Sequence, residues 1–114
     1  MPTDCVFCSI ADKSLASEII YESEEILVIP DIKPRAPIHM LVIPKKHIDS
    51  LVSLADLEIG LLGKLLDVAR RSAAKRGLDS SGYKVVINVG SDGGQVVPHL
   101  HLHVLGGKKL RDQV

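Results

Sequence analysis

The sequence predicts an α+β fold in which an antiparallel sheet of about five strands is covered on one face by one long helix. Short apolar runs rich in β-branched residues occur in both halves of the chain, and a long segment with helical periodicity separates them. Gly and Pro residues interrupt the runs where turns are needed. At 114 residues the chain is too short for two full cores, so we expect a single domain over residues 1–114.

Three strands are predicted in the first half. Residues 19–21 and 26–29 flank a polar turn and predict a hairpin. Residues 38–43 form the next apolar run, which a proline stops. Alternation along this strand places His39 on one face and Met40 on the other.

The long helix is predicted over residues 53–76. Ser53 is a suitable N-cap and Gly77 is positioned to end the helix. The apolar stripe recurs at three- and four-residue steps through Leu54, Leu57, Leu61, Leu65 and Ala69, and it is widened by Leu62, Leu66 and Ala73.

The last two strands are predicted at residues 83–89 and 99–105, joined by the glycine-rich residues 90–95. In residues 99–105 histidines alternate with apolar residues. The apolar residues can pack under the helix, so we expect the imidazoles to face away from the core. The three alternating histidines are His99, His101 and His103.

Three uses fit such a row of imidazoles: exposed polar residues, zinc ligands, or a catalytic nucleophile with its neighbours. The preceding loop favours the third. Gly90, Gly93 and Gly94 allow the backbone to approach a ligand, and successive N–H groups there can hold an anion. A flexible hairpin loop would have the same composition, but beside three histidines it indicates a phosphate site next to a nucleophile.

Charge and composition exclude several classes of protein. Basic and acidic residues balance at 14 each, which argues against a general nucleic-acid or membrane-surface binder, because these need a sustained positive field. No apolar run reaches the roughly 20 residues that span a bilayer, and the first eight residues lack the features of a secretory signal. We therefore expect a cytoplasmic protein with no nucleic-acid or membrane partner.

Residues 99–105 match the pattern His-φ-His-φ-His-φ-φ, with φ apolar, at every position, and in this the sequence resembles the histidine-triad family. The pair that follows, Gly106-Gly107, is similar to the branch of histidine-triad nucleotide-binding proteins. The resemblance covers nearly the whole chain and is also carried by residues 30–32, 36–39, 41–48 and 88–95.

The resemblance implies that His101 is the nucleophile and forms a nucleotidyl-histidine intermediate that water hydrolyses. The carbonyl of His99 or a neighbouring side chain is expected to hold its second ring nitrogen. The resemblance also implies a phosphate contact for His103, and places His39 and His99 in the relay that orients the nucleophile. The other implied nucleotide contacts are Asp31 for the ribose, Ile32 for the base, Asn88 for the phosphate, and the backbone of Gly94, Gln95 and Val96. Asp31 can also be interpreted as a turn residue after a proline.

The implied reaction is hydrolysis of nucleoside phosphoramidates or related conjugates of a purine nucleotide such as AMP, with no metal needed for the chemistry. The alternatives are a dinucleoside polyphosphate hydrolase, a nucleotidyl transferase, and a nucleotide-binding regulatory protein with negligible turnover. The resemblance further implies a homodimer that joins two sheets into one.

Cys5 and Cys8 have the spacing of half a zinc site. Zinc-bearing members of the family complete it with residues that correspond to His47 and His99. This implies a structural zinc and would make His99 a ligand instead of part of the relay. Without zinc the cysteines would be buried thiols or a redox pair. A plain zinc-binding module is a further alternative function.

Two features depart from the family pattern. Val96 stands where many members of the nucleotide-binding branch have a serine, so no hydroxyl is expected there for the leaving group. The chain also ends at Val114 without the Trp-Pro-Pro tail of some relatives, so selectivity from that tail is not expected here.

Overall fold

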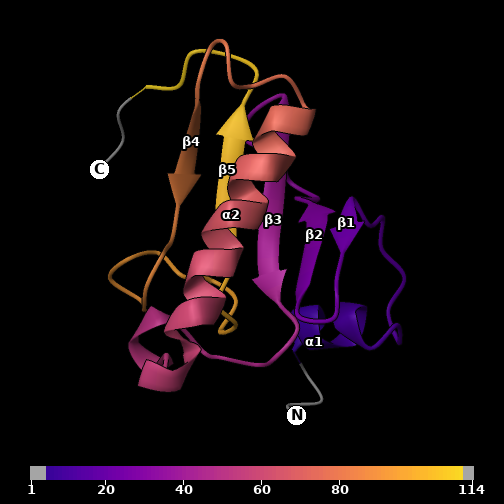
Figure 1. Cartoon of the computed structure of the whole chain (residues 1–114), viewed down its shortest axis with the longest axis vertical. Helices are drawn as coiled ribbons and strands as arrows, with labels where there is room; N and C mark the ends of the chain where they lie inside the picture. Colours follow the sequence, from indigo (N-terminus) through magenta and orange to yellow (C-terminus); the bar gives the residue numbers. More distant parts are fainter. Residues whose placement is uncertain (1–4, 112–114) are drawn as a thin grey trace.

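The computed structural model describes residues 5–111, and in it α2 lies across one face of a five-stranded antiparallel sheet (Figure 1). The strand order β1-β2-β3-β5-β4 places the last strand of the chain between β3 and β4. This confirms the predicted α+β class. In chain order the elements are α1 Val6–Ala11, β1 Tyr21–Glu22, β2 Ile26–Pro30, β3 Ile38–Pro44, the 3₁₀ turns η1 Leu51–Ser53 and η2 Asp56–Glu58, α2 Ile59–Lys75, β4 Tyr83–Val86 and β5 Leu102–Gly106.

Residues 1–4 and 112–114 lie outside the described residues. The first group includes half of the eight residues that were expected to carry no secretory signal. The second group includes Val114, the last residue of the sequence. Within residues 5–111, no helix has the length and apolar character needed to cross a membrane.

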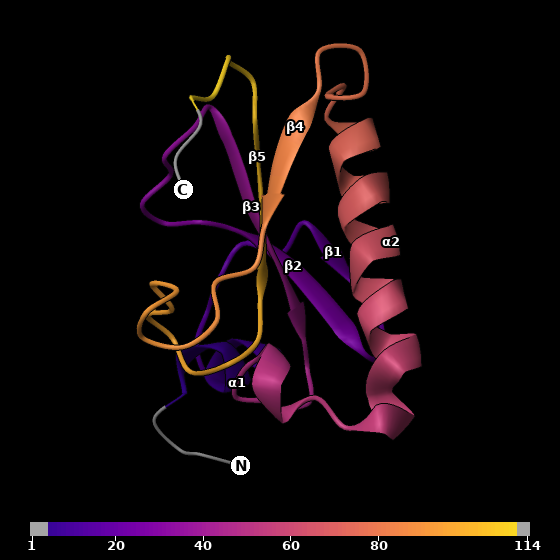
Figure 2. The same ribbon diagram turned by 90° about the vertical axis from the view of Figure 1, so that its left-hand side faces the viewer.

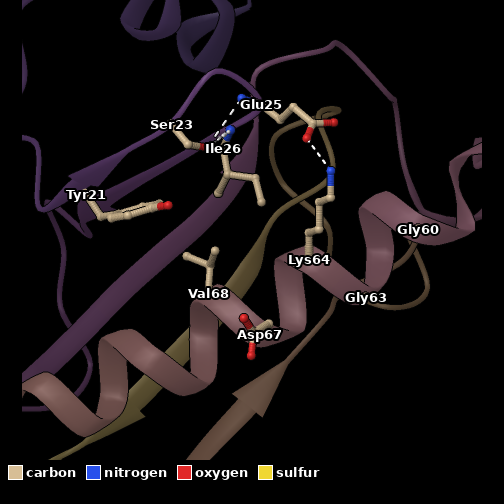
Figure 3. Close-up of a pocket in the computed structure, with 9 residues that line it drawn as sticks. All are labelled: Tyr21, Ser23, Glu25, Ile26, Gly60, Gly63, Lys64, Asp67 and Val68. Carbon is tan, nitrogen blue, oxygen red and sulfur yellow. Dashed lines mark hydrogen bonds and ion pairs between the residues drawn. The ribbon is translucent and has the colours of Figure 1, made fainter.

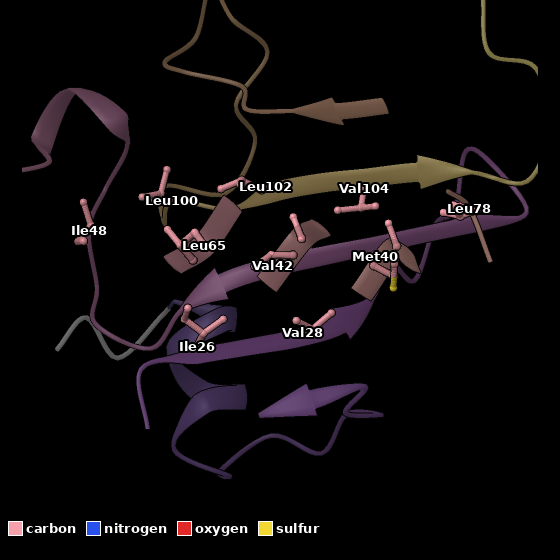
Figure 4. Packing of buried hydrophobic residues seen from close by; sticks show 12 residues of the cluster. Ile26, Val28, Met40, Val42, Ile48, Leu65, Leu78, Leu100, Leu102 and Val104 are labelled. Atoms are coloured by element: carbon pink, nitrogen blue, oxygen red, sulfur yellow. The ribbon is translucent and has the colours of Figure 1, made fainter. Parts of the chain in front are cut away.

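Apolar side chains pack on both faces of the sheet. On one face Leu65, Ala69 and Ala73 of α2 cover apolar residues of the strands (Figure 4). Leu65 is fully buried, and burying one leucine contributes about 1.5–3 kcal/mol. The other face carries a second apolar cluster beneath α1, on the side of the sheet away from α2 (Figure 2). Its buried members are Cys5, Phe7, Cys8, Ile10, Leu27, Ile29, Leu41 and Ile43.

The predicted start of the long helix was wrong. The helix begins at Ile59, and two 3₁₀ turns separated by extended residues occupy the preceding segment. Ser53 ends the first turn and caps no helix. Leu57 is 99% exposed and Leu66 is 47% exposed, so neither joins the buried stripe. The side chain of Glu58 accepts a hydrogen bond from the Ala55 amide, which holds the second turn closed. The predicted end is right, because the chain turns at Gly77 with φ +74°.

The first and last strands also differ from prediction. β1 is a two-residue pair with β2, although the Ile20 amide extends the pairing by donating to Val28. β4 stops at Val86, where the chain leaves the sheet for the glycine-rich loop. β5 begins at Leu102, so the first two histidines of the row precede the strand.

The faces of the histidine segment follow the predicted alternation, but the histidines are not exposed. Leu100, Leu102 and Val104 join the cluster under α2. The three imidazoles lie on the opposite side and are 0 to 8% exposed. Sequence reasoning missed one reason: Phe7 of α1, a helix of six residues, packs against His99 and His101.

Candidate functional site

The sheet places four histidines on its face away from α2. His39 on β3 is opposite Leu105 of β5, and His103 of β5 is opposite Leu41 of β3. His101 and His103 lie side by side, with ring centroids 4.9 Å apart. Phe7 of α1 packs its ring edge-on against His101 at 5.1 Å and against His99 at 5.7 Å. The N-terminal helix thus covers His99 and His101.

The ring of His101 is oriented by the main chain. Its Nδ1 donates a hydrogen bond of 2.7 Å to the carbonyl oxygen of His99. Since a carbonyl only accepts, the neutral imidazole carries its proton on Nδ1 and a lone pair on Nε2. This tautomer leaves Nε2 able to act as a nucleophile.

His39 and His103 form a hydrogen-bonded chain that fixes both tautomers. The Arg35 amide donates to His39 Nδ1 at 3.1 Å, so the proton of neutral His39 is on Nε2. Nε2 is 2.9 Å from His103 Nδ1 and 3.3 Å from Asp31 Oδ2. His103 therefore accepts on Nδ1 and presents an N–H on Nε2. An N–H beside a nucleophile is suited to bind a phosphoryl oxygen.

Burial keeps these two histidines neutral. It lowers the pKa of His39, against a smaller upward effect from Asp31. Burial, followed by the nearby His101, lowers the pKa of His103 from 6.5 to about 4. Both rings are therefore neutral at pH 7. The hydrogen-bonded chain requires this, because each ring must accept on Nδ1 and donate from Nε2.

The lowered pKa values of His39 and His103 predict that acid weakens the fold. The unfolded chain binds protons at these histidines near pH 6.5, whereas folded His103 does so only near pH 4. Stability is therefore fully present above pH 6.5 and is lost as the pH falls toward 4, by at most about 1.4 kcal/mol per pH unit for each group. Urea unfolding between pH 7 and 5 measures this slope, and His103→Asn should flatten it. A stability that stays level or rises over this interval would contradict the burial account.

The glycine-rich loop is held by its own side chains. Asn88 Nδ2 donates to the Gly93 carbonyl at 2.8 Å, and Gln95 Oε1 accepts from the Gly90 amide at 2.9 Å. A Cβ on Gly93 would lie 2.3 Å from the Val89 oxygen, so only glycine fits there. Hydrogen bonds within the loop thus fix its conformation. Asn88, the expected phosphate contact, uses its amide nitrogen for one of these bonds.

The apolar residues expected at the nucleotide lie on the surface. Ile32 is 91% exposed and Val96 is 89% exposed, each on a loop. The Asp31 carboxylate accepts from the Lys33 amide through Oδ1, as a turn residue does, while Oδ2 faces His39. Large apolar side chains at such exposure are suited to pack on a planar ligand.

Cys5, Cys8, His47 and His99 come together in one cluster, which we call the thiol cluster. One ligand atom from each residue lies within 4.8 Å of all the others. Nδ1 of His99 is 3.2 Å from the sulfur of Cys5, and Nδ1 of His47 is 3.2 Å from the sulfur of Cys8.

The outer nitrogens show that the thiol cluster fits a metal. Nε2 of His99 donates to the Pro44 carbonyl at 2.7 Å, and Nε2 of His47 donates to Asp49 Oδ1 at 2.7 Å. Both inner nitrogens therefore carry lone pairs that point at the thiols, and such outer acceptors are typical of metal-binding histidines. Two thiols and two imidazoles are a donor set for zinc. Sequence reasoning missed Asp49, although a carboxylate two residues after His47 is a signal for such a pair.

The redox alternative for the cysteines is less favoured. Burial, followed by the neighbouring Cys5, raises the pKa of Cys8 to about 11. A reactive cysteine needs a lowered pKa, because the thiolate is the nucleophile.

A second group, Asp31, His39 and His103, also brings its ligand atoms within 4.8 Å, but it does not fit a metal. A metal on His39 Nε2 would move the ring proton to Nδ1. There it would face the Arg35 amide, which is itself a donor. These residues fit instead the hydrogen-bonded chain from the Arg35 amide through His39 to His103.

The ring of His99 faces the thiol cluster, where its centroid lies 4.8 Å from that of His47. Its nitrogens contact Pro44 and the cysteines, and only its carbonyl reaches His101. His99 thus links the thiol cluster to the histidine expected to act as the nucleophile.

A hollow of about 450 Å³ between the β1–β2 hairpin and α2 lies away from this site (Figure 3). The ion pair between Lys64 and Glu25 spans it, and Ile26 in its wall belongs to the cluster under α2. It is therefore on the opposite side of the sheet from the histidines.

Comparison with known proteins places this site in a family. The family model described as "Scavenger mRNA decapping enzyme C-term binding" matches residues 4–112. The protein HitA of Neisseria gonorrhoeae is 44% identical over 103 residues, which are 90% of this chain and 95% of HitA. A histidine triad protein from Clostridium difficile superposes with a TM-score of 0.95 at 43% identity, covering 100% of this chain and 99% of the other. The chain belongs to the histidine-triad family. The histidine-triad hydrolase from Legionella pneumophila Philadelphia 1 is also similar, with a TM-score of 0.92 and 42% identity over 95% of this chain and 96% of its own.

Two more distant structures of histidine-triad proteins are described by what they bind. The histidine triad nucleotide-binding protein from Candida albicans has a TM-score of 0.81 and 28% identity, covering 97% of this chain and 86% of the other. A Zn-bound histidine triad family protein from Mycobacterium smegmatis has a TM-score of 0.78 and 35% identity, covering 92% of this chain and 76% of its own.

Proposed function

We propose that this protein hydrolyses phosphoramidates and related conjugates of purine nucleoside monophosphates through a nucleotidyl intermediate on His101. The observation that carries the proposal is the hydrogen bond from His101 Nδ1 to the His99 carbonyl, which leaves Nε2 with a free lone pair beside the N–H of His103. The hydrolase from Legionella pneumophila and the nucleotide-binding protein from Candida albicans support the class of reaction and ligand.

In the first half-reaction His101 Nε2 forms a bond to phosphorus while the bond from phosphorus to the leaving group breaks. The leaving group departs with the electron pair, and an amine takes up a proton from solvent. His103 donates its Nε2–H to a phosphoryl oxygen, and the Val96 amide supplies a further donor, because the amides of Gly90, Gly94 and Gln95 already bond within the loop. Water then attacks phosphorus, which releases the monophosphate and restores His101.

The nucleoside is held by the loops around the histidines. We assign Asp31 to the ribose hydroxyls, because a carboxylate accepts from paired hydroxyls. Ile32 and Val96 are exposed apolar surfaces suited to the base and its surroundings. Asn88 fixes the loop and reaches the phosphate only with its remaining donor or acceptor capacity.

We assign the thiol cluster to a structural zinc, which the Zn-bound protein from Mycobacterium smegmatis supports. Zinc would be held by two thiolates and two imidazoles and would join the N-terminal segment to the histidine strand. It does not enter the reaction steps above. The homodimer that the resemblance implies is part of the proposal, and sedimentation equilibrium of the full chain measures it.

Release of AMP from a fluorogenic adenosine phosphoramidate tests the proposed function. We expect the full chain to turn over this substrate at the same rate with and without added magnesium, since the second histidine group does not fit a metal. AMP binding is measured by calorimetry on the same sample. Tight AMP binding without turnover would make the protein a nucleotide-binding module, and the absence of both would overturn the nucleotide assignment.

A further inference from the structure

Cationic side chains gather around a hollow of about 580 Å³ at the β4 edge of the sheet. We call this hollow the basic pocket. Its lining holds five cations and one carboxylate, Asp92, in a chain whose net charge is zero. A concave surface of one sign focuses the field and concentrates ligands of the opposite charge. The five cations are Arg35, Lys84, Lys108, Lys109 and Arg111.

The cations of the basic pocket have no carboxylate partners among residues 5–111. Elsewhere in this part of the chain six lysines and arginines form ion pairs, whereas Lys33, Lys75 and Arg76 do not. The paired cations are Lys13, Lys45, Lys46, Lys64, Arg70 and Arg71. Five of the eight cations without an ion pair in residues 5–111 thus line one hollow, which favours an anionic ligand there.

The sheet register places the basic pocket beside the histidines. Lys84 and His39 are both opposite Leu105, and Val86 is opposite His103. Residues in one cross-strand row share a face of the sheet, so the pocket lies on the histidine side. Arg35, whose amide binds His39, also lines the pocket.

The glycine-rich loop supplies another wall of the basic pocket. Asn88 and Gly93, which hydrogen-bond each other, both line it. The pocket is therefore continuous with the loop to which the proposed function assigns the reacting phosphate. A group attached to a phosphate held at this loop would extend into the basic pocket, whose wall residue Val86 is opposite His103 in the sheet register.

We infer that the basic pocket binds the leaving group of the substrate and that the preferred leaving groups carry a phosphate of their own. This rests on the proposed function. When His101 bonds to the nucleotide phosphorus and the bond to the leaving group breaks, the departing amine takes the electron pair and a proton from solvent. Its own phosphate stays intact and is held by the lysines through charge-assisted hydrogen bonds.

A matched pair of substrates tests the inference. One is adenosine 5′-phosphoramidate of ethanolamine, and the other is the same compound with the ethanolamine hydroxyl phosphorylated. We expect kcat/KM to be higher for the phosphorylated substrate by at least about tenfold, the effect of one charge-assisted hydrogen bond. The ratio of the two kcat/KM values should fall as salt is added, because salt screens exposed charges.

The decisive variant is the triple substitution Lys84→Gln, Lys108→Gln and Lys109→Gln, for which the ratio should fall to near one. The charge-preserving triple substitution of the same lysines to arginine should keep the ratio. This separates charge from fold, and melting temperatures of both variants complete the comparison. Lys75→Gln removes a cation from the last turn of α2, outside the pocket, and should leave the ratio unchanged.

Each outcome decides one of the two proposals. If the wild type cleaves both substrates equally, or the glutamine variant keeps the preference, the inference is overturned while the proposed function stands. If inorganic phosphate binds the pocket but the substrates are cleaved alike, the pocket is a free-anion site and the leaving-group assignment fails. If neither substrate is cleaved and no adenylyl group appears on His101, the proposed function fails instead.

Discussion

His101→Ala should lower kcat/KM for an adenosine phosphoramidate by several orders of magnitude while AMP still binds. The substitution removes the Nε2 lone pair that the hydrogen bond from Nδ1 to the His99 carbonyl leaves free. Loss of a nucleophile typically costs about 10⁴-fold or more, because the rest of the site cannot replace the covalent step. Single-turnover kinetics with excess enzyme measure the chemical step, and calorimetry measures AMP affinity.

A buried position needs a control for the cavity that alanine leaves. His101 is 7% exposed and packs against Phe7, so part of any loss in His101→Ala could come from repacking. His101→Asn fills more of the space and should be equally inactive with a melting temperature closer to that of the wild type. Activity within tenfold of wild type in this variant would exclude His101 as the nucleophile.

Removal of zinc should produce the largest loss of stability. A bound zinc would stabilise the folded chain by about 4 kcal/mol when its free concentration is a thousand times Kd. For a domain of this size that corresponds to more than about 10 °C in Tm. The double substitution Cys5→Ser and Cys8→Ser should show the same Tm with and without zinc. Elemental analysis should find one zinc per wild-type chain and none in the double variant.

The carboxylate beside His47 gives a sharper test of the thiol cluster. Asp49→Asn keeps all four ligands but weakens the acceptor at 2.7 Å from His47 Nε2, and it should lower zinc affinity about 10- to 100-fold. Asp56→Asn removes a carboxylate at the first position of the η2 turn and serves as the matched control. Equal zinc affinity in the two variants would mean that Asp49 does not support the site. If chelator leaves the Tm of the wild type unchanged, a structural zinc is excluded.

The sequence correctly predicted those parts of the fold in which apolar residues recur with a regular period. The alternation of residues 99–105 correctly placed Leu102 and Val104 under the helix, and the stripe through Leu65 correctly placed the face of α2. The error at Leu57 arose because leucine spacing continues through a segment that a 3₁₀ turn and extended residues interrupt. Local hydrogen bonds, such as that from the Ala55 amide to Glu58, decide this start and are invisible to periodicity.

The candidate site was predictable in its residue types but not in its connections. The cysteine pair and the histidines were identified from the sequence. In the structure Cys5, Cys8, His47 and His99 form one cluster. Phe7, which packs against His99 and His101, comes from a six-residue helix too short to predict. Main-chain groups settle the tautomers, and backbone contacts such as the Arg35 amide to His39 have no signature in a sequence.

The central claim is a covalent bond between His101 and the nucleotide, and mass spectrometry after rapid quenching tests it most directly. Wild-type protein is mixed with an adenosine phosphoramidate, stopped in base within the first turnover, and digested. We predict one adenylyl group per chain, on the peptide that carries His101, formed and lost at rates that account for kcat. Turnover at an undiminished rate with no adenylyl group at any time point would contradict the account and favour direct attack by water.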